Sequence, residues 1–155
     1  MSNASGPVST AGFLLSKIGK EATERFAIKI TPLSMRPKHC GLLNAVAAFP
    51  PMSQQELGRA LHLVPSAIVT IIDDLIALHA LRRVADPNDR RRYTIEITRQ
   101  GHSLLTKVTK LAQEVDAELV VDLSETERDA LYRALGKIAA VLNLFPALDG
   151  KHKNS

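Results

Sequence analysis

The sequence has little of several residue types, and each shortage excludes a class of protein. It contains a single cysteine, Cys40, which excludes an intramolecular disulfide and any metal site built from several cysteines. Tryptophan is absent and aromatic residues make up 4% of the chain, so we expect an aliphatic core. No apolar run is long enough to span a membrane, and residues 1–10 lack the pattern of a secretory signal. We therefore expect a cytoplasmic protein without a membrane partner.

Motifs for catalysis are missing too. The five histidines are His39, His62, His79, His102 and His152. None belongs to a His-Glu-x-x-His motif, and the sequence has neither a glycine-rich phosphate loop nor a nucleophile motif. We expect no catalytic residue, no metal site and no cofactor, and we expect the histidines to be surface or helix-capping residues. For Cys40, the role of a small buried apolar residue in a helix is favoured, and redox sensing stays open.

The positive charge of the chain is concentrated in one segment. At 155 residues the chain is predicted to form one continuous folding unit, after a disordered tail over residues 1–10. Its net charge is +4, and residues 82–92 contain five arginines against two aspartates. These arginines are Arg82, Arg83, Arg90, Arg91 and Arg92. Such a cluster is typical of a protein that binds a polyanion, and nucleic acid is favoured over an acidic protein surface.

Apolar residues at three- and four-residue steps predict that the protein is mainly α-helical. The first helix runs from Ala11 to Ile30 and ends near Pro32. A second, buried helix begins at Pro37 and ends before Pro50.

Two short helices follow, joined by a tight turn. Ser53 and Glu56 have the spacing of a capping box, which predicts that a helix starts there, and Pro65 suits the first position of the next helix. The predicted buried face of this later helix is Ile68, Ile71, Ile72, Leu75 and Leu78. The outward residues at its start are Ser66, Ala67, Val69 and Thr70. This pair of helices reads as a helix-turn-helix, in which the outward residues would contact DNA bases.

The next segment predicts a β-hairpin. Residues 80–85 form one candidate strand, and residues 91–98 alternate apolar and polar side chains with the period of a half-buried strand. Asp86-Pro87-Asn88-Asp89 supplies turn residues between them, and we expect the arginines at the hairpin tip. A charged hairpin that follows a helix-turn-helix is the wing of a winged helix.

Two long amphipathic helices close the chain. Thr98 is expected to cap the first, and Ser124 with Glu127 has capping-box spacing at the start of the second. The residues expected to be buried along the second helix are Leu131, Leu135, Ile138 and Leu142. The apolar stripes of the terminal helices exceed what one small winged-helix core can cover, which favours a homodimer.

Residues 53–101 resemble the winged-helix core of the multiple-antibiotic-resistance regulator (MarR) family, and with the flanking helices the resemblance covers residues 11–145. Its most specific part is the wing pattern Asp-x-Arg, present as Asp89-Arg90-Arg91, followed at the family's spacing by Thr98 and Gly101. The resemblance implies a DNA-binding core over residues 34–98 and a helical dimerisation region over residues 11–33 and 99–146.

The same resemblance implies roles for the wing and for the whole molecule. Arg91 would enter the minor groove of double-stranded DNA, and Asp89 would brace the wing. Beside that resemblance, we expect Arg90 and Arg92 to face phosphates or to flank the groove. The expected protein is a sequence-specific regulator, a homodimer on a pseudo-palindromic operator, and a repressor that a small phenolic or lipophilic acid releases. A winged helix used only for protein contact, and an architectural DNA-binding protein without an effector, stay open as alternatives.

The chain departs from the family in two places and leaves the effector open. His79 stands where the family has a glycine after the recognition helix, so the entry to the wing is expected to differ. From Ala60 to Leu81 there is no arginine or lysine, which leaves hydroxyl groups and contacts with thymine methyls for reading bases. An effector site is predicted at the start of the second helix, at Arg36, His39 and Cys40.

Overall fold

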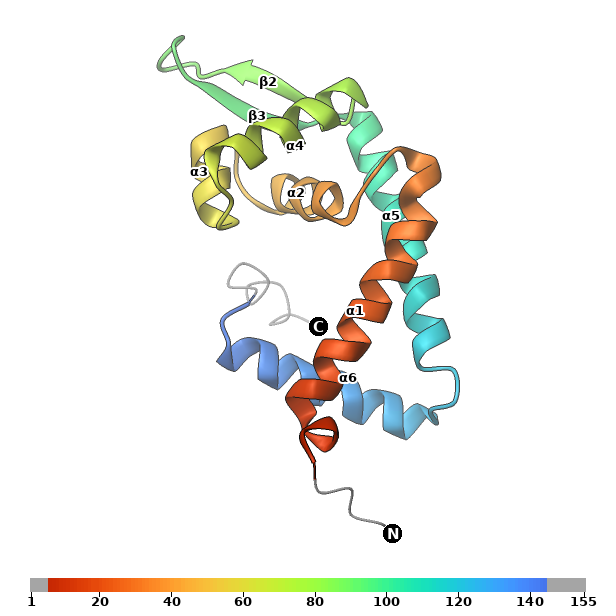
Figure 1. Ribbon diagram of the computed structural model, residues 1–155. Helices are drawn as coiled ribbons and strands as arrows, with labels where there is room; N and C mark the ends of the chain where they lie inside the picture. The colour runs from red at the N-terminus through yellow and green to blue at the C-terminus, as the bar shows by residue number, and fades with distance from the viewer. Residues whose placement is uncertain (1–5, 145–155) are drawn as a thin grey trace. The chain divides into compact units, whose positions relative to one another are not determined.

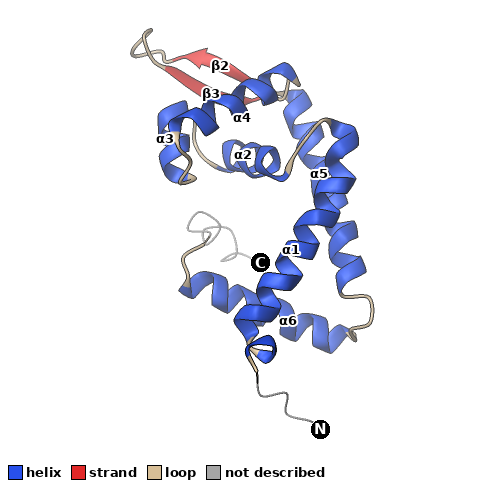
Figure 2. Ribbon diagram, viewed as in Figure 1, coloured by secondary structure: helices blue, strands red, loops and turns tan. Residues whose placement is uncertain are grey.

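The computed structural model describes residues 6–144, which are mainly helical with a small antiparallel sheet (Figures 1 and 2). In chain order the elements are η1 Pro7–Ser9, α1 Ala11–Ile30, η2 Thr31–Leu33, α2 Pro37–Ala48, β1 Met52–Ser53, α3 Gln54–Ala60, α4 Pro65–Ala77, β2 Leu81–Ala85, β3 Tyr93–Ile97, α5 Arg99–Leu119 and α6 Glu125–Val141. Of the tail expected at residues 1–10, residues 1–5 lie outside the described part, and Pro7–Ser9 forms a 3-10 turn. The chain separates into two compact units, up to Asp116 and from Ala117.

The capping chemistry expected from the sequence is present. At the start of α3, the Glu56 N–H donates to Ser53 Oγ at 3.2 Å, and the Ser53 N–H donates to the Glu56 carboxylate at 2.7 Å. Ser124 and Glu127 form the same reciprocal pair at the start of α6. Pro65 is the first residue of α4, where a helix has no use for the missing N–H. These local signals explain why the predicted helix starts are confirmed.

The core of the first unit lies between α2, α4 and the sheet. Its fully buried large side chains are Ile30, Leu42, Leu43, Leu57, Ile71, Ile72 and Leu75. Helix α2 contacts α1, α4 and β3, and α3 contacts α4, so the aliphatic residues form one cluster. Burial of each such side chain contributes about 1.5–3 kcal/mol. The core fixes the exposed face of α4, because the opposite face of that helix is buried in it.

The predicted hairpin is confirmed. Strands β2 and β3 pair antiparallel, with a register that runs from Leu81 opposite Ile97 to Ala85 opposite Tyr93 (Figure 2). Strand β1, which the sequence did not predict, adds two residues to the other edge of β3 and gives the order β1-β3-β2. A two-residue strand has no periodicity of its own, and only its pairing with a distant segment defines it.

The junction between α4 and the wing has the geometry of a glycine-terminated helix, although it contains no glycine. His79 has φ 57°, in the left-handed region, and its N–H donates to the Ile76 carbonyl at 2.8 Å. The Ala80 N–H donates to the Leu75 carbonyl at 2.9 Å, which completes a Schellman motif. His79 therefore adopts the left-handed conformation that a glycine would have, and the expectation that the helix ends differently before β2 is wrong.

Thr98 ties the start of α5 to this junction. Its hydroxyl donates to the His79 carbonyl at 2.6 Å, and it accepts the Gly101 N–H at 2.9 Å, which confirms the expected cap. A Cβ added at Gly101 would overlap the Ala80 carbonyl oxygen, so this close approach requires glycine. The base of the wing is thereby held against both α4 and α5.

The burial expected along α6 is wrong. No residue of this helix is buried: Leu131 and Leu135 are half-buried and Ile138 is 42% exposed, and Leu142, the C-cap residue, is 60% exposed. The helical period was read correctly, because the helix forms over the expected residues. A period identifies an apolar stripe but does not say which surface covers it.

Candidate nucleic-acid interface

The loop at the tip of the wing is held by its own aspartates. The Asp86 carboxylate accepts the Asn88 N–H at 2.9 Å, and the Asp89 carboxylate accepts the Arg91 N–H at 3.0 Å. The Arg92 N–H donates to the Asp89 carbonyl at 2.9 Å, and the Asp86 N–H donates to the Arg92 carbonyl at 2.8 Å. Asx turns of this kind fix a loop that has no core to pack against.

Two of the five arginines are not at the tip, which corrects the sequence-based expectation. Arg82 and Arg83 lie in β2, toward the base of the hairpin. Arg82 pairs with Glu96 on the opposite strand at 2.9 Å, and Arg83 pairs with Asp73 of α4 at 2.6 Å. The first pair joins residues that are directly opposite in the register. Arg82 therefore joins the two strands of the wing, and Arg83 joins the wing to α4.

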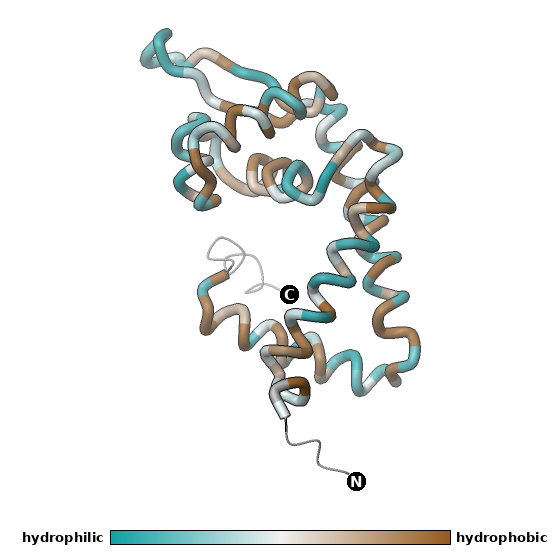
Figure 3. The backbone as a smooth tube through the Cα atoms, viewed as in Figure 1, coloured by the Kyte–Doolittle hydropathy of each residue, from teal (hydrophilic) through white to brown (hydrophobic). Residues whose placement is uncertain are grey.

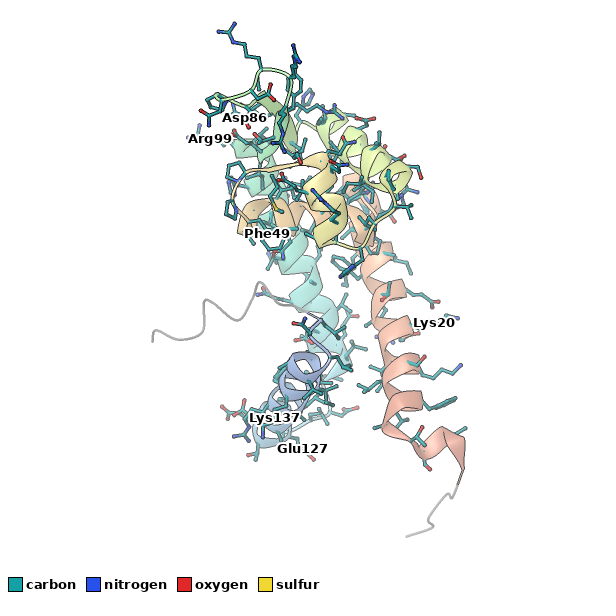
Figure 4. All side chains as sticks on the ribbon, turned by 90° about the vertical axis from the view of Figure 1, so that its left-hand side faces the viewer. Lys20, Phe49, Asp86, Arg99, Glu127 and Lys137 are labelled. Atoms are coloured by element: carbon teal, nitrogen blue, oxygen red, sulfur yellow. The ribbon has the colours of Figure 1, made fainter. Side chains whose placement is uncertain are left out.

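Positive charge remains at the tip itself. Arg92 lies 4.0 Å from Glu56, at the limit of an ion pair, whereas Arg90 and Arg91 have no ion-pair partner among residues 6–144. Figure 3 shows the loop between β2 and β3 as strongly hydrophilic. Figure 4 shows nitrogen-ended side chains that extend from the loop beyond Asp86, away from the helices. The tip is thus a thin, protruding structure with unpaired guanidinium groups.

The exposed start of α4 presents small and apolar groups. Ser66, Val69 and Thr70 are exposed as expected, whereas Ala67 is half-buried. The Thr70 hydroxyl donates to the Ser66 carbonyl at 3.0 Å, so its proton is used inside the helix. Sequence reasoning missed Val64, the N-cap residue, whose side chain is 62% exposed. No periodic pattern in the sequence marks the turn residue before Pro65 as exposed.

The two aspartates of α4 have partners that the sequence did not reveal. Asp73 pairs with Arg83 of the wing, and the Asp74 carboxylate accepts a hydrogen bond from His39 Nε2 at 2.9 Å and lies 3.3 Å from the Arg36 guanidinium. The hydrogen bond from His39, and then the nearby positive charge, hold the pKa of the Asp74 carboxyl below its usual value. The acidic character of this helix is therefore balanced within the protein.

The predicted effector residues have structural roles as well. His39 is buried, and its Nδ1 accepts the Arg36 N–H at 2.9 Å, so both ring nitrogens have partners within the chain. The Arg36 side chain is 62% exposed. Burial raises the pKa of the half-buried Cys40 thiol to about 11, which disfavours a reactive thiolate. Of the three residues, Arg36 presents the most accessible polar group.

Two kinds of site are absent from the part of the chain that the structure describes. Residues 6–144 contain no group of three or more histidine, cysteine or acidic side chains that could hold a metal ion. None of their helices alone is long and apolar enough to cross a membrane. Helices α3 and α4 together have the length and apolar composition of a membrane span, but they are bent by 116° at the break between them.

A helix-turn-helix followed by a charged β-hairpin defines a winged-helix DNA-binding protein. The sequence model of the MarR family matches residues 33–92. A transcriptional regulatory protein proposed for the hcr operon of Thauera aromatica is 30% identical over 128 residues, which are 82% of this chain and 77% of that protein. The chain belongs to the MarR family of transcriptional regulators, which are DNA-binding proteins and not enzymes.

Solved structures have the same fold. The apo form of MarR from E. coli gives a TM-score of 0.72 at 21% identity, and covers 83% of this chain and 96% of its own. The transcriptional repressor CouR, bound to a 23-mer DNA duplex, gives a TM-score of 0.70 at 27% identity, and the match covers 84% of this chain and 92% of CouR.

Proposed function

We propose that this chain is a homodimeric, sequence-specific repressor, in which the wing tip and the start of α4 from each subunit contact a pseudo-palindromic operator. The observation that carries the proposal is the unpaired Arg90 and Arg91 on a braced, protruding hairpin beside an exposed helix start. A guanidinium on so thin a loop suits a minor groove about 6 Å wide, particularly over A·T tracts with enhanced negative potential. Arg91 would enter the groove, and Arg90 and Arg92 would face phosphates.

Exposed apolar side chains support the dimer. On α1, Leu14 is 48% and Ile18 is 54% exposed, and on α6, Ile138 and Leu142 are similarly uncovered. Apolar rows of this extent on monomeric proteins usually mark an interaction surface. Residues 11–33 and 99–146 would supply the dimerisation region around the core at 34–98. A two-fold dimer places half-sites about 10 base pairs apart on one face of the DNA.

The test is selection of bound sequences from random duplex DNA, with sedimentation of the same protein at micromolar concentration. We expect a palindromic motif and a dimer. Enrichment of no sequence, with equal binding to random duplex, would favour an architectural DNA-binding protein. Absence of any salt-sensitive duplex binding would favour a winged helix used for protein contact. A monomer that still binds the selected duplex would contradict the dimer.

An effector that relieves repression would be a small, partly apolar acid held near Arg36. Its guanidinium is exposed, and the carboxylate of such an acid could compete with Asp74 for it. Thermal shift with salicylate-like acids should stabilise the wild type more than Arg36→Ala. Equal shifts in both proteins would remove Arg36 from the site.

A further inference from the structure

The exposed surface of α4 is dominated by methyl groups. Val64 is 62% and Val69 is 38% exposed, and the Thr70 hydroxyl donates its proton to the Ser66 carbonyl at 3.0 Å and so is not free as a donor. Pro65 carries no N–H, so the first residue of the helix offers no backbone donor either. The Ser66 hydroxyl is the remaining side-chain donor on this part of the surface.

The charged residues of α4 do not supply a donor for reading bases. The helix contains no arginine or lysine, so the bidentate contact with guanine that basic side chains make is absent from it. Its two acidic residues, Asp73 and Asp74, are held by Arg83 on one side and by His39 with Arg36 on the other. These interactions orient both carboxylates toward partners within the protein and offset their charge.

We propose that Val64 and Val69 read the C5-methyl groups of thymines in the major groove, and that each half-site therefore contains thymines whose methyls determine specificity. Thymine carries the apolar group of the major-groove edge, and the N-terminal residues of a recognition helix are those that meet base edges. This inference rests on the proposed function and specifies which base feature the recognition helix recognises.

The test replaces thymines one at a time by deoxyuridine in the duplex obtained by selection. Deoxyuridine keeps every hydrogen-bonding group and removes only the methyl. At the positions under Val64 and Val69 we expect affinity to fall about three- to fivefold per methyl, the effect of losing one buried methylene-sized group. Thymines outside the contact should tolerate the exchange without loss.

Two variants assign the effect to side chains. Val69→Ala should bind the thymine duplex more weakly than wild type and should no longer distinguish thymine from deoxyuridine at one position. Val64→Ala should do the same at a different position. Val8→Ala is the matched control, because Val8 is 57% exposed and lies outside both the DNA-binding core and the proposed dimerisation region. Circular dichroism and melting of each variant check that the exposed substitutions leave the fold intact.

The outcomes separate this inference from the proposed function. A selected operator at which every deoxyuridine exchange is neutral, or at which Val69→Ala and Val64→Ala retain the full thymine preference, overturns the methyl readout while leaving the regulator intact. A protein that selects no sequence overturns both.

Discussion

Asp89 lies among arginines at the wing tip, and its carboxylate accepts the backbone N–H of Arg91 at 3.0 Å. A carboxylate beside DNA phosphates is repelled, so its presence at a tip proposed to face DNA needs a compensating role. Holding the loop in shape supplies that role, because in the proposed complex it would orient the Arg91 side chain toward the minor groove. If Asp89 acted only through its charge, its removal would tighten DNA binding. If it braces the loop, its removal would weaken DNA binding.

Asp89→Ala should weaken operator binding by roughly fivefold, the equivalent of about 1 kcal/mol for one lost hydrogen bond, although the variant is more basic. Asp89→Asn, which keeps an acceptor oxygen at the same position, should retain most of the affinity. Fluorescence anisotropy with a labelled operator measures both. Tighter binding by a folded, dimeric Asp89→Ala would show that the acid is only a solvated turn residue.

Cys40 is protonated at neutral pH, because burial raises its pKa to about 11. Peroxide reacts with thiolates, so we expect treatment of the protein to leave DNA binding unchanged. Mobility shift before and after peroxide, with intact mass to detect oxidation, checks this. Loss of binding in the wild type but not in Cys40→Ser would restore a redox role.

Among the elements, α4 ends in a left-handed residue that is not glycine. An L-residue in this conformation costs roughly 1–2 kcal/mol, whereas glycine adopts it freely but loses more chain entropy on folding. His79→Gly should therefore raise the free energy of unfolding by up to about 1 kcal/mol, measured by urea denaturation. His79→Ala keeps the strain and should give no gain. Destabilisation by glycine would mean that the histidine side chain itself supports the junction.

The start of α3 predicts a dependence of stability on pH. Hydrogen bonds from Ser53 lower the pKa of the Glu56 carboxyl in the folded protein. A lowered folded-state pKa stabilises the protein above the unfolded value of about 4.3, and this contribution is lost as pH falls from there through the folded pKa. Glu56→Gln keeps a capping oxygen without the charge, so its unfolding free energy should fall less steeply with acid than that of the wild type. Parallel pH profiles for the two proteins would contradict this role.

The elements that the sequence predicted well are those with local causes. Ser53 with Glu56, Pro65 and Thr98 act within three or four residues of themselves, so their caps could be read directly. The ion pairs of Asp73 and Asp74 could not, because each joins elements whose approach depends on the whole fold. The same limit applies to β1, to the exposure of Val64 and to the division of the arginines between the base and the tip of the wing.

For the whole molecule, these pairings decide where charge is available. Arg82 and Arg83 are engaged at the wing base, while Arg90 and Arg91 remain unpaired at the tip. The loop proposed to meet DNA, residues 86–92, holds three arginines against two aspartates, and the backbone uses those two carboxylates as turn acceptors. In the proposed dimer, the exposed apolar row of α1 and that of α6 would each contact the second copy, and two wings would then be available to one operator.

The most direct measurement is the salt dependence of operator affinity for the wild type, Arg91→Ala and the charge-matched control Arg133→Ala. We expect Arg91→Ala to bind at least about tenfold more weakly to both the operator and random duplex, with a slope of log affinity against log salt that is smaller by about one unit. Arg133 lies in the proposed dimerisation region, so sedimentation first checks that Arg133→Ala is still a dimer, and its affinity and slope should then resemble those of the wild type. A folded, dimeric Arg91→Ala with wild-type affinity and slope would contradict the role of the wing in DNA binding.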